Sequence, residues 1–108
     1  MGEVVQLFQK KPLSPAIEKL KAFKEGLEKG IVMITLDATR LDVSVPSYLS
    51  EDIYLSLNYS YTYQLPDFAF DEEGVSATLS FNEGYFYCLV PWEAVYRVGN
   101  QVWPEDFP

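Results

Sequence analysis

The stretch GVSATLSFNEGYFYCLV, residues 74–90, decides the fold of this chain. From Val75 to Phe81, apolar side chains alternate with small polar ones, which is the period of a strand with one buried face. Asn82-Glu83-Gly84 has the composition of a tight reversal, and residues 85–90 return as a second strand. The stretch therefore predicts an antiparallel β-hairpin.

Strands are also predicted on both sides of this hairpin. Residues 53–63 carry Ile, Leu or Tyr at every odd position, an alternation that lasts eleven residues. A strand of that length must bend or contribute to two sheets, as strands of small barrels do. Shorter apolar or alternating stretches bounded by Gly and Pro predict further strands at 31–36, 43–45, 93–98 and 101–103.

One helix precedes the strands. Ser14 offers an N-cap hydroxyl, Pro15 suits the first helical position, and Gly30 supplies the left-handed residue that ends a helix. Apolar residues recur on one face of this helix, at spacings of three and four: Ala16, Leu20, Phe23 and Leu27. Such a stripe packs on the sheet of its own chain or also meets a second copy of the chain, and both interpretations stay open.

These elements predict a mainly β member of the α+β class, built as one domain. We expect an arm at residues 1–13 and a domain at 14–108, with a helix at 14–30 and a small antiparallel barrel or strongly curved sheet at 31–108. A chain of 108 residues is long enough for one hydrophobic core and too short for two.

The charge of the chain argues against some partners. The formal net charge is −8, and beyond Gly30 twelve Asp and Glu residues stand against Arg40 and Arg97, a balance of −10. That field would repel phosphate backbones, so nucleic acid is not expected as a partner. The apolar runs fall far below the roughly 20 residues that span a bilayer, and a single Cys88 forms no internal disulfide. No leader pattern is visible, and we expect a cytoplasmic protein.

Catalytic side chains are scarce. The chain has no His and one Cys, so neither a catalytic triad nor a zinc site is expected. Acids do cluster, as Asp37 with Asp42 and as Asp71 with Glu72 and Glu73. These positions fall at strand edges and in a reversal, where acids commonly form turns. We therefore expect no enzyme activity, no metal and no cofactor.

The remaining distinctive feature is strand surface rich in short polar and aromatic side chains. Strand edges and faces of this kind hold extended peptides through main-chain hydrogen bonds and side-chain pockets. The polar positions expected to face outward are Ser56, Asn58, Ser60, Thr78 and Ser80. The alternative is that they form a solvated strand face without a ligand.

The order of the segments supports a more specific hypothesis. Leu36-Asp37-Ala38-Thr39 leads to Leu41, Val43, Val45 and Pro46 and, through Tyr48-Leu49, to residues 53–58; residues 74–81, a Gly-bearing reversal, Leu89-Val90-Pro91 and Ala94-Val95 follow. In order and spacing, residues 14–107 resemble the stringent starvation protein B (SspB) family, and the block from Asp37 to Pro46 carries the most weight.

The resemblance implies a small SH3/Sm-like barrel and a homodimer formed by the helix through Ile17, Leu20, Phe23 and Leu27. It also implies a non-enzymatic adaptor that binds the ribosome-rescue (ssrA) tag and delivers tagged proteins to the ClpXP protease. The tag groove would be formed by Leu57, Asn58, Tyr59, Ser60 and Tyr61 on one strand and by Ala77, Thr78, Leu79, Ser80 and Phe81 on another. Family members dock on the ClpX unfoldase through a tail after the barrel, so ClpX is an implied partner if such a tail follows Pro108.

Two other functions stay open. An Sm-like or OB-like nucleic-acid-binding module would stack bases on its aromatic side chains, but it needs a basic groove. A structural subunit would use the same helix and an edge strand to join another protein.

The residues 77–81 contain no basic side chain, so an acidic tag would find the local field unfavourable.

Overall fold

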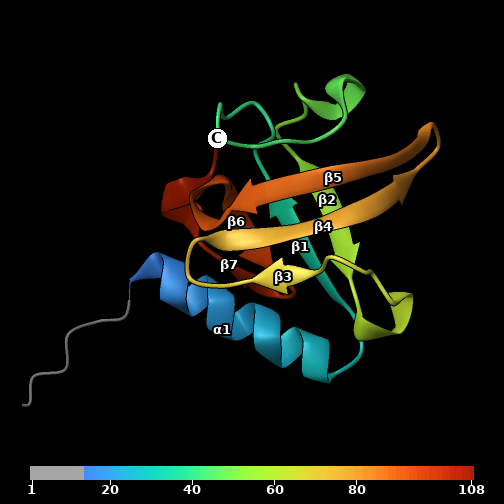
Figure 1. Ribbon diagram of the computed structural model, residues 1–108. Coiled ribbons are helices and arrows are strands. Elements are labelled where there is room, and N and C mark those ends of the chain that lie inside the picture. Colours follow the sequence, from blue (N-terminus) through green and yellow to red (C-terminus); the bar gives the residue numbers. More distant parts are fainter. Residues whose placement is uncertain (1–13) are drawn as a thin grey trace, which may run out of the picture.

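The computed structural model describes residues 14–108, and the predicted arm at 1–13 lies outside the described residues. One helix is followed by antiparallel sheets, which confirms the predicted mainly β, α+β fold class (Figure 1). The helix and strands are α1 (Pro15–Glu28), β1 (Val32–Leu36), β2 (Leu55–Tyr59), β3 (Ala69–Phe70), β4 (Gly74–Phe81), β5 (Gly84–Pro91), β6 (Val95–Val98) and β7 (Gln101–Val102).

Helix α1 has the predicted N-cap and ends at Glu28, two residues before the predicted end at Gly30. The Ile17 N–H donates to the Ser14 Oγ at 3.3 Å, and Pro15 occupies the first helical position. Gly30 follows two residues after the helix with a φ of 122°, a conformation that residues with a side chain rarely adopt. The chain then enters β1.

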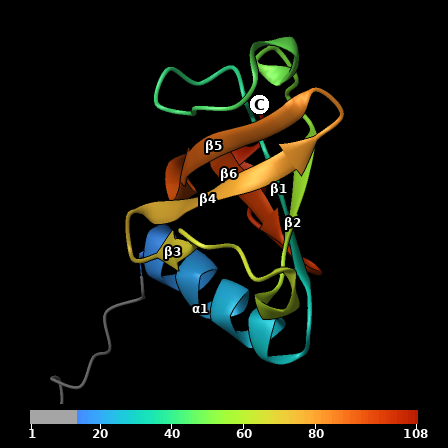
Figure 2. The same cartoon turned by 45° about the vertical axis from the view of Figure 1, so that its right-hand side comes forward.

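The strands form two sheets, in the orders β2-β1-β6-β7 and β3-β4-β5. The β4-β5 hairpin is the one predicted from residues 74–90, with Phe81 opposite Gly84 at its tip. Figures 1 and 2 show this hairpin crossing the β2-β1-β6 sheet, with α1 below both sheets. The predicted closed barrel is not observed: within residues 14–108 the sheets are open, and a single bridge between Ser44 and Leu89 joins β5 to the segment after β1.

The core lies between the helix and the two sheets. The fully buried Phe23 of α1 makes edge contacts with Tyr59, Phe70 and Trp92, at ring-centroid distances of 5.3, 5.3 and 5.5 Å. Edge-to-face packing of this kind adds to the stabilisation from apolar burial. The helix stripe therefore packs on the sheets of its own chain. No helix of the described chain is long and apolar enough to cross a membrane.

The predicted eleven-residue strand at 53–63 is wrong in length, since β2 covers five residues. Before it, the Tyr54 N–H donates to the Asp52 side chain instead of to a neighbouring strand. After it, the Ser60 Oγ donates to the Gly30 carbonyl at 2.6 Å and accepts from the Thr62 N–H, which turns the chain into a 3-10 helix. Side-chain hydrogen bonds to the main chain therefore end the strand that the alternation predicts.

The predicted strand at 43–45 is also wrong, because only Ser44 pairs with another segment there. A turn in which the Val43 N–H donates to the Arg40 carbonyl precedes it, and Pro46 follows. Proline has no N–H to donate to a ladder, so pairing with β5 stops after one bridge.

Candidate functional site

A groove of about 890 Å³ opens between the edge of β2 and the tip half of β4. Three parts of the chain line it: β2, the connection after β2, and the β4-β5 hairpin. The lining residues are Ser56, Leu57, Asn58, Tyr63, Gln64, Leu65, Pro66, Thr78, Leu79, Ser80, Phe81 and Tyr85. Two strands from different sheets thus meet at one groove, 20 or more positions apart in the sequence.

The β2 wall presents unpaired main-chain groups. In β1, the Met33 carbonyl and the Asp37 N–H bond toward β6, so residues of that parity face away from β2. Because strands alternate, the other β1 residues, Val32, Ile34 and Leu36, bond to Tyr59, Leu57 and Leu55 of β2. Ser56 and Asn58 therefore turn their main-chain N–H and C=O groups to the other edge, where no described strand pairs with β2.

The β4 wall presents a second, shorter edge. The Thr78 N–H and hydroxyl donate to the two oxygens of the Asp67 carboxylate at 2.8 and 2.6 Å. The main-chain groups of the even-numbered β4 residues therefore point away from β5. Ser80 has the same parity, lies beyond Asp67, and has no described strand beside it on that edge. Asp67 occupies the place of a strand partner at Thr78 and leaves Ser80 open.

The structure brings together six of the ten residues predicted for a peptide groove. Their side chains or main chains line the groove, and they are Leu57, Asn58, Thr78, Leu79, Ser80 and Phe81. The other four do not line it. Tyr59 and Ala77 are fully buried under the sheets, Ser60 is tied to Gly30, and Tyr61 packs against Phe68 at 5.9 Å between ring centroids.

Six groove residues were not predicted as site residues from the sequence. One is Ser56, which was predicted only to face outward, and the other five were not singled out at all. They are Tyr63, Gln64, Leu65, Pro66 and Tyr85. Four of them belong to the connection after β2, which turns back because Gln64 adopts a left-handed conformation with a φ of 55°. The sequence signal was weak, since Gln is not a residue that marks such a turn. Tyr85 was placed in a predicted strand, and its exposure became known only from the structure.

The residues predicted for a homodimer interface divide into two pairs. Phe23 and Leu27 are buried within the chain itself, which corrects their assignment, because their side chains have no surface left for a second copy. Ile17 and Leu20 are half-buried on the same helix. Dimer formation through these two residues stays a prediction.

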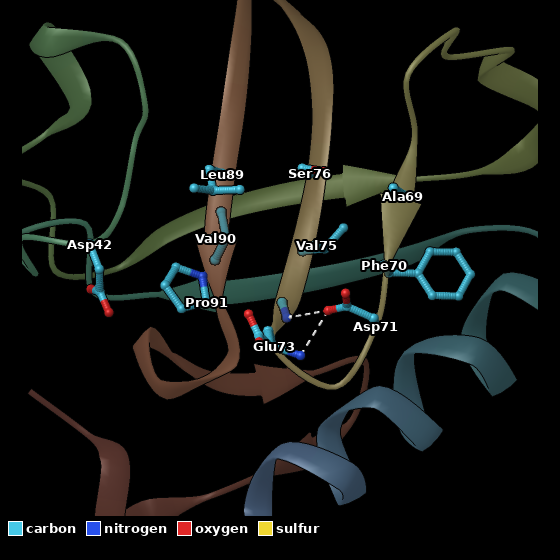
Figure 3. A pocket seen from close by; sticks show the side chains of 11 residues that line it. Asp42, Ala69, Phe70, Asp71, Glu73, Val75, Ser76, Leu89, Val90 and Pro91 are labelled. Carbon is cyan, nitrogen blue, oxygen red and sulfur yellow. Dashed lines mark hydrogen bonds between the residues drawn. The ribbon is translucent and has the colours of Figure 1, made fainter.

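A second, smaller hollow of about 280 Å³ lies at the other end of the β4-β5 hairpin (Figure 3). Three acids line it: Asp42 approaches from the segment after β1, and Asp71 and Glu73 belong to the turn between β3 and β4. The Asp71 Oδ1 accepts from the N–H groups of Glu73 and Gly74 at 2.8 and 3.3 Å, so this acid forms the turn. Among the described residues, no group of three potential ligands is placed to hold a metal ion.

Two buried polar groups have no role at the groove. Burial raises the pKa of the Cys88 thiol to about 11, which keeps it protonated and unreactive at neutral pH. Burial, with a smaller contribution from Cys88, also raises the pKa of Tyr59 far above its ordinary value. The Tyr59 hydroxyl has no hydrogen-bond partner in the described part of the chain. Both side chains pack as parts of the core.

No protein-family model and no curated protein matches this chain.

Proposed function

We propose that this protein is a non-enzymatic adaptor that binds extended peptide tags in the groove between β2 and β4. The observation that carries the proposal is the pair of unpaired strand edges, at Ser56 and Asn58 on one wall and Ser80 on the other. An extended peptide satisfies such edges by main-chain hydrogen bonds, and its side chains enter the adjacent hollows. Leu57, Leu79 and Phe81 form the apolar floor that these side chains meet.

In this proposal the two sheets are the open form of a small SH3/Sm-like barrel. A bound peptide strand occupies the gap between β2 and β4. Unpaired edges otherwise attract other chains, and proteins usually cover or charge them. The edge positions at Ser56, Asn58 and Ser80 are uncharged, which is a reason to expect a regular occupant there.

The tag that we propose is the one that ribosome rescue adds to stalled proteins, and the receiving enzyme is the ClpXP protease. This part rests on the resemblance in the order and spacing of segments from residue 14 to 107. Binding the tag beside the protease raises the effective concentration of the tagged protein there, and no chemistry by the adaptor is needed.

A titration with a fluorescent peptide of the rescue tag from the same genome tests the proposal. Tyr63→Ala removes a half-exposed ring from the groove and is expected to weaken binding about tenfold, since aromatic side chains commonly dominate such contacts. Tyr54→Ala is the matched control, because this exposed ring stands before β2 and outside the groove. For a chain in which a docking tail follows Pro108, faster degradation of a tagged fluorescent protein by ClpXP, with substrate below KM, is the expected second readout.

The outcomes separate the alternatives. If the unmodified protein binds no tag peptide, the adaptor proposal is wrong. Equal losses from Tyr63→Ala and Tyr54→Ala would move the binding site away from the groove. Stoichiometric co-purification with one protein, without tag binding, would instead indicate a structural subunit.

A further inference from the structure

The walls of the groove between β2 and β4 carry no charge. All twelve lining residues are apolar, aromatic, hydroxyl or amide residues. A charged group of a peptide that enters the groove therefore gains no ion pair from the walls, and it loses part of its hydration. The charged groups of a bound peptide can therefore interact only with charged residues at the rim of the groove.

The rim is acidic. Within two positions of any lining residue in the sequence, the charged residues are Asp67, which follows Pro66, and Glu83, which stands between Phe81 and Tyr85 in the hairpin tip. Both are exposed. The hydrogen bonds from the Thr78 hydroxyl and N–H lower the pKa of Asp67, so its negative charge persists at neutral pH.

Basic side chains lie elsewhere in the described chain. Arg40 is within 3.8 Å of the carboxylates of Asp42 and Glu93, and the Nε of Arg97, a residue of β6, donates to the Gly99 carbonyl. The four described Lys residues belong to α1 and its C-cap. None of these six lines the groove, and Lys29 lines, together with Glu25, a neighbouring hollow that shares Asn58 with it. The local field has the same sign as the net charge of −8.

We propose that the groove selects extended peptides that are neutral or positively charged, with Lys or Arg beside uncharged residues, and rejects acidic ones. The inference rests on the proposed function and specifies its ligand. A Lys or Arg at the end of the groove next to the hairpin tip lays its apolar stem and charge on the exposed ring of Tyr85 and reaches Glu83. A Glu at the same place meets like charge and no donor of opposite charge.

Three forms of one fluorescein-labelled rescue-tag peptide test this, with Lys, Gln or Glu at the two positions that flank its uncharged core. At low salt the Lys form is expected to bind about tenfold tighter than the Glu form, with the Gln form between them. The preference should shrink at about 0.5 M salt, because exposed charges are then screened within a few ångströms.

A matched pair of variants locates the effect. Glu83→Lys and Glu72→Lys change the net charge equally, at exposed positions just beyond opposite ends of β4, an eight-residue strand about 25 Å long. Glu83→Lys is expected to reduce the Lys-over-Glu preference at least threefold, and Glu72→Lys to leave it within a factor of about 1.5.

Failure of this inference differs from failure of the proposed function. If all three peptides bind equally, or the Glu form binds best, the charge preference is overturned while groove binding stands. Equal effects of Glu83→Lys and Glu72→Lys would assign the preference to net charge and overturn the role of the rim. If no form binds, the proposed function falls and the inference falls with it.

Discussion

At the scale of single residues, Asp67 determines where the β4 edge beside the groove is open. Its carboxylate binds the Thr78 N–H and hydroxyl, and so it closes one position of the β4 edge while the next position stays open. Hydrogen bonds to the charged form lower the pKa of this carboxyl. The bond from the Thr78 hydroxyl contributes most, and the bond from the Thr78 N–H comes second. The pKa in the folded state therefore lies below that in the unfolded chain.

This difference gives a pH dependence with a fixed sign. A carboxyl with a depressed folded-state pKa stabilises the fold above its unfolded-state pKa, and the contribution disappears as pH falls through the folded-state value. Asp67→Asn is therefore expected to lower the urea midpoint at pH 7, and the gap to the unmodified protein should narrow below about pH 4. Urea unfolding followed by circular dichroism at several pH values measures this.

Glu83→Gln is the control for the Asp67 variant. It also removes an exposed carboxylate from the rim, but the hydrogen bonds of Thr78 go to Asp67 and not to Glu83. Its urea midpoint should follow that of the unmodified protein from pH 7 downward. A gap for Asp67→Asn that stays constant to pH 2 would contradict the proposed linkage.

At the scale of elements, the strands with a clear alternation were predictable and the ends of those strands were not. In β4, Val75, Ala77 and Leu79 are buried as the two-residue period predicts, because that period is a property of the strand itself. In residues 53–63 the same period continues to Tyr63, but Ser60 bonds to Gly30, 30 positions away. A contact between such distant residues leaves no local pattern.

The groove was predictable in part for the same reason. The two strands that flank it could be identified by their alternation, and six predicted residues line it. The connection after β2 could not be placed, since its position depends on the left-handed Gln64 and on Phe68, whose ring stacks on Tyr59 at 5.7 Å. Such packing depends on the folded chain and not on neighbouring sequence.

The open edges of β2 and β4 make a prediction about their amide groups. The N–H groups of Ser56, Asn58 and Ser80 face the groove, where no strand of residues 14–108 pairs with them, so they should exchange with deuterium quickly in the free protein. At a peptide concentration of about ten times Kd, these amides should exchange about tenfold more slowly. Exchange followed residue by residue by NMR gives the measurement.

The control amide for exchange is that of Tyr87, which belongs to the opposite edge of the same hairpin. It has the parity of Leu89, whose N–H donates away from β4 to the Ser44 carbonyl. Its rate should not change on peptide addition. If Tyr87 slows as much as Ser80, the protection reflects general stabilisation, and main-chain pairing in the groove is not supported.

At the scale of the whole molecule, a buried Lys joins the two ends of the described chain. Lys19 of α1 is 1% exposed, and its Nζ donates to the Trp92 carbonyl and to Asp106 Oδ2, each at 2.8 Å. The same Nζ lies 5.7 Å from the Trp103 ring centroid, and the Trp103 Nε1 donates to Glu18. A helical Lys is ordinarily solvated, so no local pattern indicates that this one holds the C-terminal segment.

The Lys19–Asp106 pair should therefore matter for the stability of the fold more than a surface ion pair does. Lys19→Met keeps most of the apolar stem and leaves Asp106 without its partner. Because Asp106 is 30% exposed and regains some hydration, the expected loss of unfolding free energy is about 1–3 kcal/mol, below that of a fully buried pair. Lys21→Met, at an exposed position of the same helix, should change it by less than about 0.5 kcal/mol. Denaturant unfolding measures both. Equal midpoints for the two variants would mean that the core around Phe23, and not the buried ion pair, holds α1 to the C-terminal segment.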